Sequence, residues 1–111
     1  MKITYNKLIR DHIPEIISRN GKKYSVRKLS QDEFPSALAA KLIEEGKEVT
    51  EAISENDRIG IIKELADLSE VFETLVDVLD IKIDEIREIQ LRRKNTRGGF
   101  SERLWLEWVE E

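Results

Sequence analysis

The sequence contains no cysteine and a single histidine, His12, among its 111 residues. Without cysteine the chain has no disulfide, no iron–sulfur cluster, no thiolate zinc site and no cysteine nucleophile. One histidine also excludes a multi-histidine metal site within one chain, and we assign His12 no role. These absences exclude several common metal and nucleophile chemistries.

Proline and glycine are also scarce, with two prolines and five glycines, and no apolar run exceeds four residues. Apolar residues make up 40% and charged residues 38%, a composition typical of one charge-rich, mostly helical domain over residues 1–111. The short apolar runs exclude a transmembrane helix. The first residues show no signal-peptide pattern, so we expect a cytoplasmic protein without a membrane partner. The net charge of −4 gives no attraction to a nucleic-acid polymer.

Apolar spacing and capping residues predict four helical segments. These are a short helix within "RDHIPEIISRNG", a long helix that follows the capping-box pair Ser30 and Glu33 and runs to about Ser54, a second long helix from about Asp57 to Leu79, and a fourth through "IDEIREIQLRRKN". A polar break separates the two long helices, and two glycines end the last helix.

Residues 23–29 and the tail 103–109 alternate apolar and polar residues, which favours strands. The tail also fits a helix, but a strand at 23–29 would need a partner, so we predict a small two-stranded β ribbon. The predicted class is all-α, a MazG-like bundle built on a helical hairpin, with this ribbon beside it. We interpret Trp105 and Trp108 as core or dimer contacts, with base stacking as the alternative.

The first long helix carries an acidic residue inside its apolar stripe. At about 100° per residue, Glu45 lies at the centre of this stripe and Glu48 on its shoulder. The apolar residues around Glu45, all within about 60° of it, are Phe34, Leu38, Leu42, Val49 and Ala52. On the second long helix, Glu64 and Asp67 lie beside apolar positions. Carboxylates on inward faces need a compensating charge or a proton.

The four acids are symmetric about Asn56 in the polar break. Glu48 and Glu64 are each eight residues from Asn56, and Glu45 and Asp67 are each eleven residues from it. A hairpin that turns there brings the four carboxylates to similar heights, about 12 to 17 Å from the turn. Mg²⁺ prefers oxygen ligands and bridges carboxylates to substrate phosphates, so the pattern predicts a metal site. Acids on a solvated helix face are the alternative interpretation.

These motifs resemble a known family. "EEGKE", followed after fifteen residues by "ELAD", resembles the EExxE…ExxD signature of MazG-type nucleotide pyrophosphohydrolases. "YNKLIRDHIPEII" and "KNTRGGFSERLWLE" are similar to the ends of a branch described as phosphoribosyl-ATP pyrophosphohydrolase-like, or as predicted house-cleaning enzymes for noncanonical nucleotides. The resemblance covers nearly the whole chain. It implies an all-α homodimer or homotetramer that hydrolyses a nucleoside triphosphate between its α- and β-phosphates, giving a monophosphate and pyrophosphate.

Position in the signature implies the metal ligands. The resemblance assigns Mg²⁺, with Mn²⁺ as a substitute, to Glu45, Glu48, Glu64 and Asp67. Glu44 is the leading acid of the motif, and the resemblance gives it one of two roles: a hydrogen bond to the metal ligands from outside their shell, or orientation of the water molecule. Either Glu44 or Glu48 is the candidate base that takes the proton of the attacking water.

A triphosphate also needs polar and cationic partners. The candidates for substrate binding are Lys7, Arg10, Lys94, Asn95 and Arg97. For the last three, a solvated cation cluster at a helix C-terminus is an equally good interpretation.

Two other functions remain open. The hairpin could be a non-catalytic nucleotide- or metal-binding module that acts through a protein partner, or a structural helical protein whose acids lie on the surface.

Overall fold

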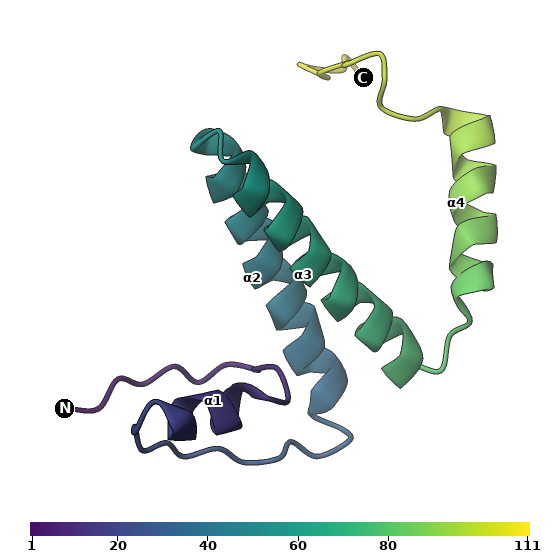
Figure 1. The fold of residues 1–111 in the computed structure, drawn as a ribbon. Helices are drawn as coiled ribbons and strands as arrows, with labels where there is room; N and C mark the ends of the chain where they lie inside the picture. The colour runs from purple at the N-terminus through teal and green to yellow at the C-terminus, as the bar shows by residue number, and fades with distance from the viewer. The chain divides into compact units, whose positions relative to one another are not determined.

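The computed structural model describes residues 1–111 and contains four helices and no strand (Figure 1). The helices are α1 (Ile13–Arg19), α2 (Phe34–Ser54), α3 (Arg58–Val78) and α4 (Ile83–Arg97). The chain forms two compact units, Met1–Asp80 and Ile81–Glu111. The all-α class and the four predicted helical segments are confirmed, and the single domain over residues 1–111 stays a prediction. None of the helices combines the length and apolar character needed to cross a lipid bilayer.

Helices α2 and α3 form the hairpin on which the first unit is built, lying side by side in opposite directions (Figure 1). Each has 21 residues, or about 31 Å at 1.5 Å per residue. The buried apolar side chains are Leu38 and Ala52 of α2 and Val76 of α3. Glu45 lies midway between Leu38 and Ala52 at heptad spacing and is buried with them. The apolar core of the hairpin is therefore small, and an acidic residue occupies its centre line.

The turn between α2 and α3 is set by two adjacent polar residues. Asn56 has a φ of 54°, a left-handed conformation that asparagine tolerates better than most residues. Its N–H donates to the Ile53 carbonyl at 3.1 Å, and the Asp57 N–H donates to the Ala52 carbonyl at 3.1 Å, which together make a Schellman motif. The Asp57 carboxylate then accepts from the Gly60 N–H at 3.0 Å and caps α3. The hairpin turn is thus fixed locally, at the position that the sequence predicts.

The predicted capping box before α2 forms. The Ser30 N–H donates to the Glu33 carboxylate at 3.1 Å, and the Glu33 N–H donates to the Ser30 hydroxyl at 3.2 Å. Arg27 donates two further hydrogen bonds to Glu33, at 3.3 and 3.0 Å. The hydrogen bond from Arg27, followed by those from Ser30, lowers the pKa of Glu33 to about 2. The box stabilises a turn that precedes the helix, which itself begins at Phe34.

The predicted β ribbon is absent, which corrects the sequence-based expectation. Residues 23–29 and 104–111 are extended or irregular chain and form no ladder hydrogen bonds. The tail is not helical either, and its Trp105 and Trp108 are 88% and 74% exposed, so neither is buried within the second unit. Alternation of apolar residues stabilises a strand only where a partner strand exists, and neither segment has a partner strand within its own unit.

The side of α3 that packs against α2 carries two acidic residues, and several apolar residues of α3 lie on the opposite, exposed side. Glu64 and Asp67 are half-buried, whereas Ile59, Ile62 and Leu65 are 83%, 57% and 46% exposed. These three exposed residues, which we call the outer face of α3, are spaced three residues apart on one side of the helix. The hairpin therefore leaves an apolar surface uncovered within the first unit.

Candidate active site

Three carboxylates from the two long helices converge in the hairpin. Glu45 of α2 and Glu64 and Asp67 of α3 each offer one oxygen atom, and these oxygens lie within 4.8 Å of one another. We call these residues the carboxylate cluster. Glu45 is 7% exposed and is the buried charged residue of the chain. Oxygen atoms gathered at this spacing from two rigid elements form a donor set suited to a hard divalent cation.

The carboxylate cluster is electrostatically costly without a counterion. Two unit charges about 5 Å apart repel by about 3 kcal/mol at an effective dielectric constant of about 20. Burial, then a hydrogen bond with Glu64, and also the charges of Asp67 and Glu64 raise the pKa of Glu45, while the Lys41 ammonium opposes this shift. The donor set therefore fits a cation that would neutralise it.

Lys41 is a cation of this site that the sequence analysis did not identify. Its Nζ atom lies 3.6 Å from Oε1 of Glu45 and 3.4 Å from Oε1 of Glu44. The Lys41 side chain is only 16% exposed, so its charge is held close to the buried carboxylate. The signal was available, because a lysine four residues before Glu45 and three before Glu44 lies on the same side of a helix.

The N-terminal segment supplies two further cations, both among the predicted substrate-binding residues. Nη2 of Arg10 donates to Oδ1 of Asp67 at 2.7 Å, a contact between residues 57 positions apart. Nζ of Lys7 lies 3.5 Å from Oε1 of Glu44. The same segment lines a surface hollow of about 240 Å³ against α2. We call it the basic hollow; it is lined by Asn6, Lys7, Leu8, Ala37, Ala40, Lys41 and Glu44.

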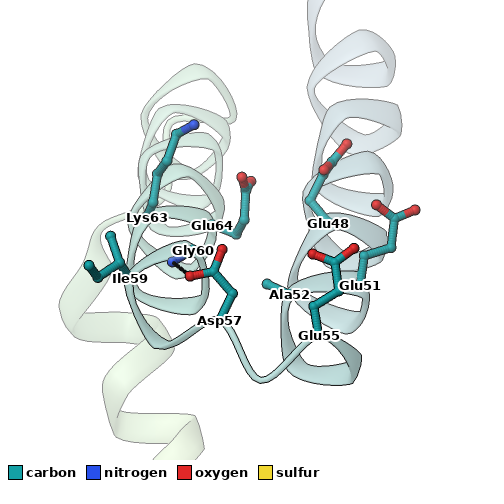
Figure 2. A pocket seen from close by; sticks show the side chains of 9 residues that line it. All are labelled: Glu48, Glu51, Ala52, Glu55, Asp57, Ile59, Gly60, Lys63 and Glu64. Atoms are coloured by element: carbon teal, nitrogen blue, oxygen red, sulfur yellow. Dashed lines mark hydrogen bonds between the residues drawn. The ribbon is translucent and has the colours of Figure 1, made fainter.

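Glu48 lies outside the carboxylate cluster. Figure 2 shows Glu48 on α2 and Glu64 on α3, both lining a hollow of about 280 Å³ between the two helices. This acidic hollow is lined by Glu48, Glu51, Ala52, Glu55, Asp57, Ile59, Gly60, Lys63 and Glu64. Glu48 is exposed and makes no salt bridge, unlike Glu44. Of the four predicted metal ligands, the structure brings three together and leaves the fourth beside Glu64, nearer the turn.

The remaining predicted substrate residues belong to the second unit. Lys94, Asn95 and Arg97 lie in the last turns of α4, which is followed by its C-cap residue Gly98 with a φ of 84°. All three are exposed, and the Gly98 N–H donates to the Lys94 carbonyl at 2.8 Å. The positive charges of Lys94 and Arg97 interact favourably with the C-terminal end of the helix dipole, which agrees with the alternative interpretation of a solvated cation cluster. Their role toward a substrate stays a prediction.

Comparison with known proteins gives one family match and one partial match to a curated protein. The sequence matches the profile of the phosphoribosyl-ATP pyrophosphohydrolase family over residues 4–95. It is also 48% identical over 46 residues to an uncharacterized protein of Mycolicibacterium smegmatis, a match that covers 41% of this chain. The matched region spans about half, 47%, of the length of that curated relative. No solved structure matches the chain.

Proposed function

Because the chain belongs to the phosphoribosyl-ATP pyrophosphohydrolase family, within the MazG-like nucleotide pyrophosphohydrolases, we propose that it hydrolyses a nucleotide at the bond between the α- and β-phosphates. The products would be a nucleoside monophosphate, or a related monophosphate, and pyrophosphate. The observation that carries this proposal is the carboxylate cluster, in which a buried glutamate is held among two other acids. A purely structural hairpin would gain stability from an apolar residue at this position.

We propose that the carboxylate cluster binds a divalent cation, preferably Mg²⁺, with Mn²⁺ as a substitute. The assignment follows from donor chemistry, because carboxylate oxygens suit both ions. When bound, the cation would polarise the phosphate, offset its developing charge and lower the pKa of a water molecule. Glu45, Glu64 and Asp67 would hold it, and Glu48 lines the acidic hollow together with Glu64.

Glu48 is the better placed of the two candidate bases. It lines the acidic hollow and has no cationic partner, so its carboxylate is free to accept a proton from water. Glu44 is engaged by Lys7 and Lys41 instead. In the proposed reaction, a water oxygen attacks the α-phosphorus and the bond to the bridging oxygen breaks. Glu48 takes the water proton, and pyrophosphate leaves with the bridging oxygen.

The phosphates are best received on the side of the basic hollow. Lys7 and Lys41 line this hollow, and Arg10 lies at the neighbouring Asp67. By contrast, the acidic hollow offers five carboxylates and one lysine, which would repel a polyphosphate. We therefore propose Lys7 and Arg10 as phosphate-binding residues of the first unit. Lys94, Asn95 and Arg97 remain proposed contacts from the second unit, on the strength of their charge and polarity alone.

We further propose a homodimer or homotetramer. Only three apolar side chains are buried in the chain, while the outer face of α3 is exposed. A helix pair with so small a core gains most by burying such a face against a further copy. Sedimentation equilibrium of the wild type against an Ile62→Glu variant tests this proposal. A monomeric wild type would contradict it.

The test of the activity is pyrophosphate release from a panel of nucleotides, canonical and modified triphosphates and phosphoribosyl-ATP, with and without Mg²⁺. We expect metal-dependent release together with the matching monophosphate. Glu45→Gln should abolish this release, whereas Glu51→Gln, which also removes one carboxylate from α2, should retain most of it. Release that survives in Glu45→Gln would contradict the assigned site. Metal and nucleotide binding without release from any substrate would favour the non-catalytic module.

A further inference from the structure

The cations around the carboxylate cluster differ in how they are held. Lys41 belongs to the same helix as Glu45 and Glu44, so it stays beside them whenever α2 is folded. Arg10 reaches Asp67 from the extended N-terminal segment, across 57 positions of sequence. Its side chain is 57% exposed, whereas that of Asp67 is 28% exposed. Arg10 is therefore the cation that can leave the cluster without unfolding a helix.

Arg10 and a bound cation would compete for the same carboxylate group. The Arg10 guanidinium donates to Oδ1 of Asp67, and a carboxylate oxygen of Asp67 is one of the three oxygens that converge in the cluster. A guanidinium and a divalent ion that both lie beside this carboxylate would also repel each other. Charge compensation by Arg10 and charge compensation by a metal ion therefore oppose each other at Asp67.

We propose that the Arg10–Asp67 ion pair is an exchangeable contact, in which Arg10 holds Asp67 in the metal-free protein and releases it to the nucleotide phosphates when a divalent cation is bound. This inference rests on the proposed metal site. It makes Arg10 a positioning residue in the free protein and a phosphate ligand in the loaded one. Metal binding thereby makes Arg10 available to phosphate, so phosphate binding becomes stronger in the metal-loaded protein.

Reciprocity gives the expected size of the effect. If metal binding weakens the hold of Arg10 on Asp67, Arg10 must weaken metal binding by the same factor. Exposed ion pairs contribute up to about 1 kcal/mol, which corresponds to roughly a two- to fivefold change in affinity. We therefore expect Arg10→Gln to bind Mg²⁺ about two- to fivefold more tightly than the wild type in the absence of nucleotide.

Two measurements on the whole chain test the exchange, with Mg²⁺ alone as the probe. The first is calorimetric titration of the wild type, Arg10→Gln and Lys7→Gln. The Lys7 variant is a matched control, because it removes the same charge from the same segment but from a pair with Glu44, outside the carboxylate cluster. The second is the guanidinium NMR signal of Arg10, assigned by its absence in Arg10→Gln. Arg19, which pairs with Glu15 on α1 at 3.5 Å, is the internal control.

The exchange predicts that Mg²⁺ shifts the Arg10 signal toward that of a free arginine, leaves the Arg19 signal unchanged, and binds more tightly to Arg10→Gln than to Lys7→Gln. Mg²⁺ binding with an unchanged Arg10 signal would overturn the exchange but leave the metal site standing. Equal gains in both variants would also overturn it, because a general charge effect would then suffice. Absence of Mg²⁺ binding to the wild type would overturn the metal site and the exchange together.

Discussion

The Nζ atom of Lys41 lies 3.6 Å from Oε1 of Glu45, one helical turn before it on α2. Both side chains are largely buried, with exposed fractions of 16% and 9%. This pair explains how the hairpin tolerates an acidic residue on its centre line. The lysine offsets part of the burial cost and of the repulsion by Glu64 and Asp67.

Replacing Lys41 should destabilise the metal-free protein. We expect Lys41→Met to lower the free energy of unfolding by about 1 kcal/mol, because Glu45 would lose its compensating charge in a buried position. Lys63→Met is the control, since Lys63 is exposed and makes no salt bridge. Urea denaturation measures both variants. In a Lys41→Met/Glu45→Gln double variant the loss should largely disappear, and an undiminished loss would show that Lys41 acts through packing instead.

Replacing Glu45 should separate stability from metal binding. We expect metal-free Glu45→Gln to melt about 4–8 °C above the wild type, since removing one charge from the carboxylate cluster gains about 1 kcal/mol. Mg²⁺ at about 100 times its dissociation constant should stabilise the wild type by about 2.7 kcal/mol and leave Glu45→Gln unchanged. Calorimetric melting with Glu51→Gln as the control checks both effects. An equal Mg²⁺ response in the two glutamine variants would refute the assignment of Glu45.

The capping box predicts a pH dependence at the start of α2. Arg27, and then Ser30, lower the pKa of Glu33 from 4.5 to about 2, so the folded state releases this proton more readily than the unfolded chain. The stabilisation is therefore present above pH 4.5 and is lost as the pH falls toward 2. NMR titration of the Glu33 carboxyl group tests this. In Arg27→Met the pKa should move back toward 4.5, and a titration unaffected by that change would contradict the role of Arg27.

The cap of α3 predicts the sensitivity of the hairpin turn. Asp57→Ala should lower the free energy of unfolding by about 1 kcal/mol, because the Gly60 N–H loses its acceptor at the helix N-terminus. Asp57→Asn keeps an acceptor oxygen at this position and should restore most of the stability. Glu55→Ala, an exposed change on the other side of Asn56, serves as the control in urea denaturation. Equal losses in the alanine and asparagine variants would exclude capping as the cause.

The convergence of Glu45, Glu64 and Asp67 follows from helical phase and hairpin symmetry, which are local properties, and their role as metal ligands stays a prediction. Glu45 and Asp67 are equidistant from Asn56, and the turn forms there through hydrogen bonds made within a few residues. Glu48 differs because a separation of three residues rotates it about 60° away from Glu45. Its carboxylate is therefore exposed in the acidic hollow instead of buried in the cluster.

The β ribbon shows where such reasoning fails. The alternation at 23–29 and 103–109 indicates which face each segment would bury as a strand. It does not show that another segment pairs with it. Residues around Tyr24 and Leu104 therefore remain extended or irregular and exposed. Strand pairing is a property of two segments together, and pattern in one segment cannot decide it.

The sequence by itself determined the helices, the turn at Asn56 and the placing of acidic residues from α2 and α3 at one height, because these follow from short-range spacing. Only the tertiary structure decided which cations neutralise those acids. The spacing of Lys41 and Glu45 predicts their contact. The contact between Arg10 and Asp67 instead depends on the path of the N-terminal chain over the hairpin. That path is fixed by contacts between residues distant in sequence, which no local pattern records.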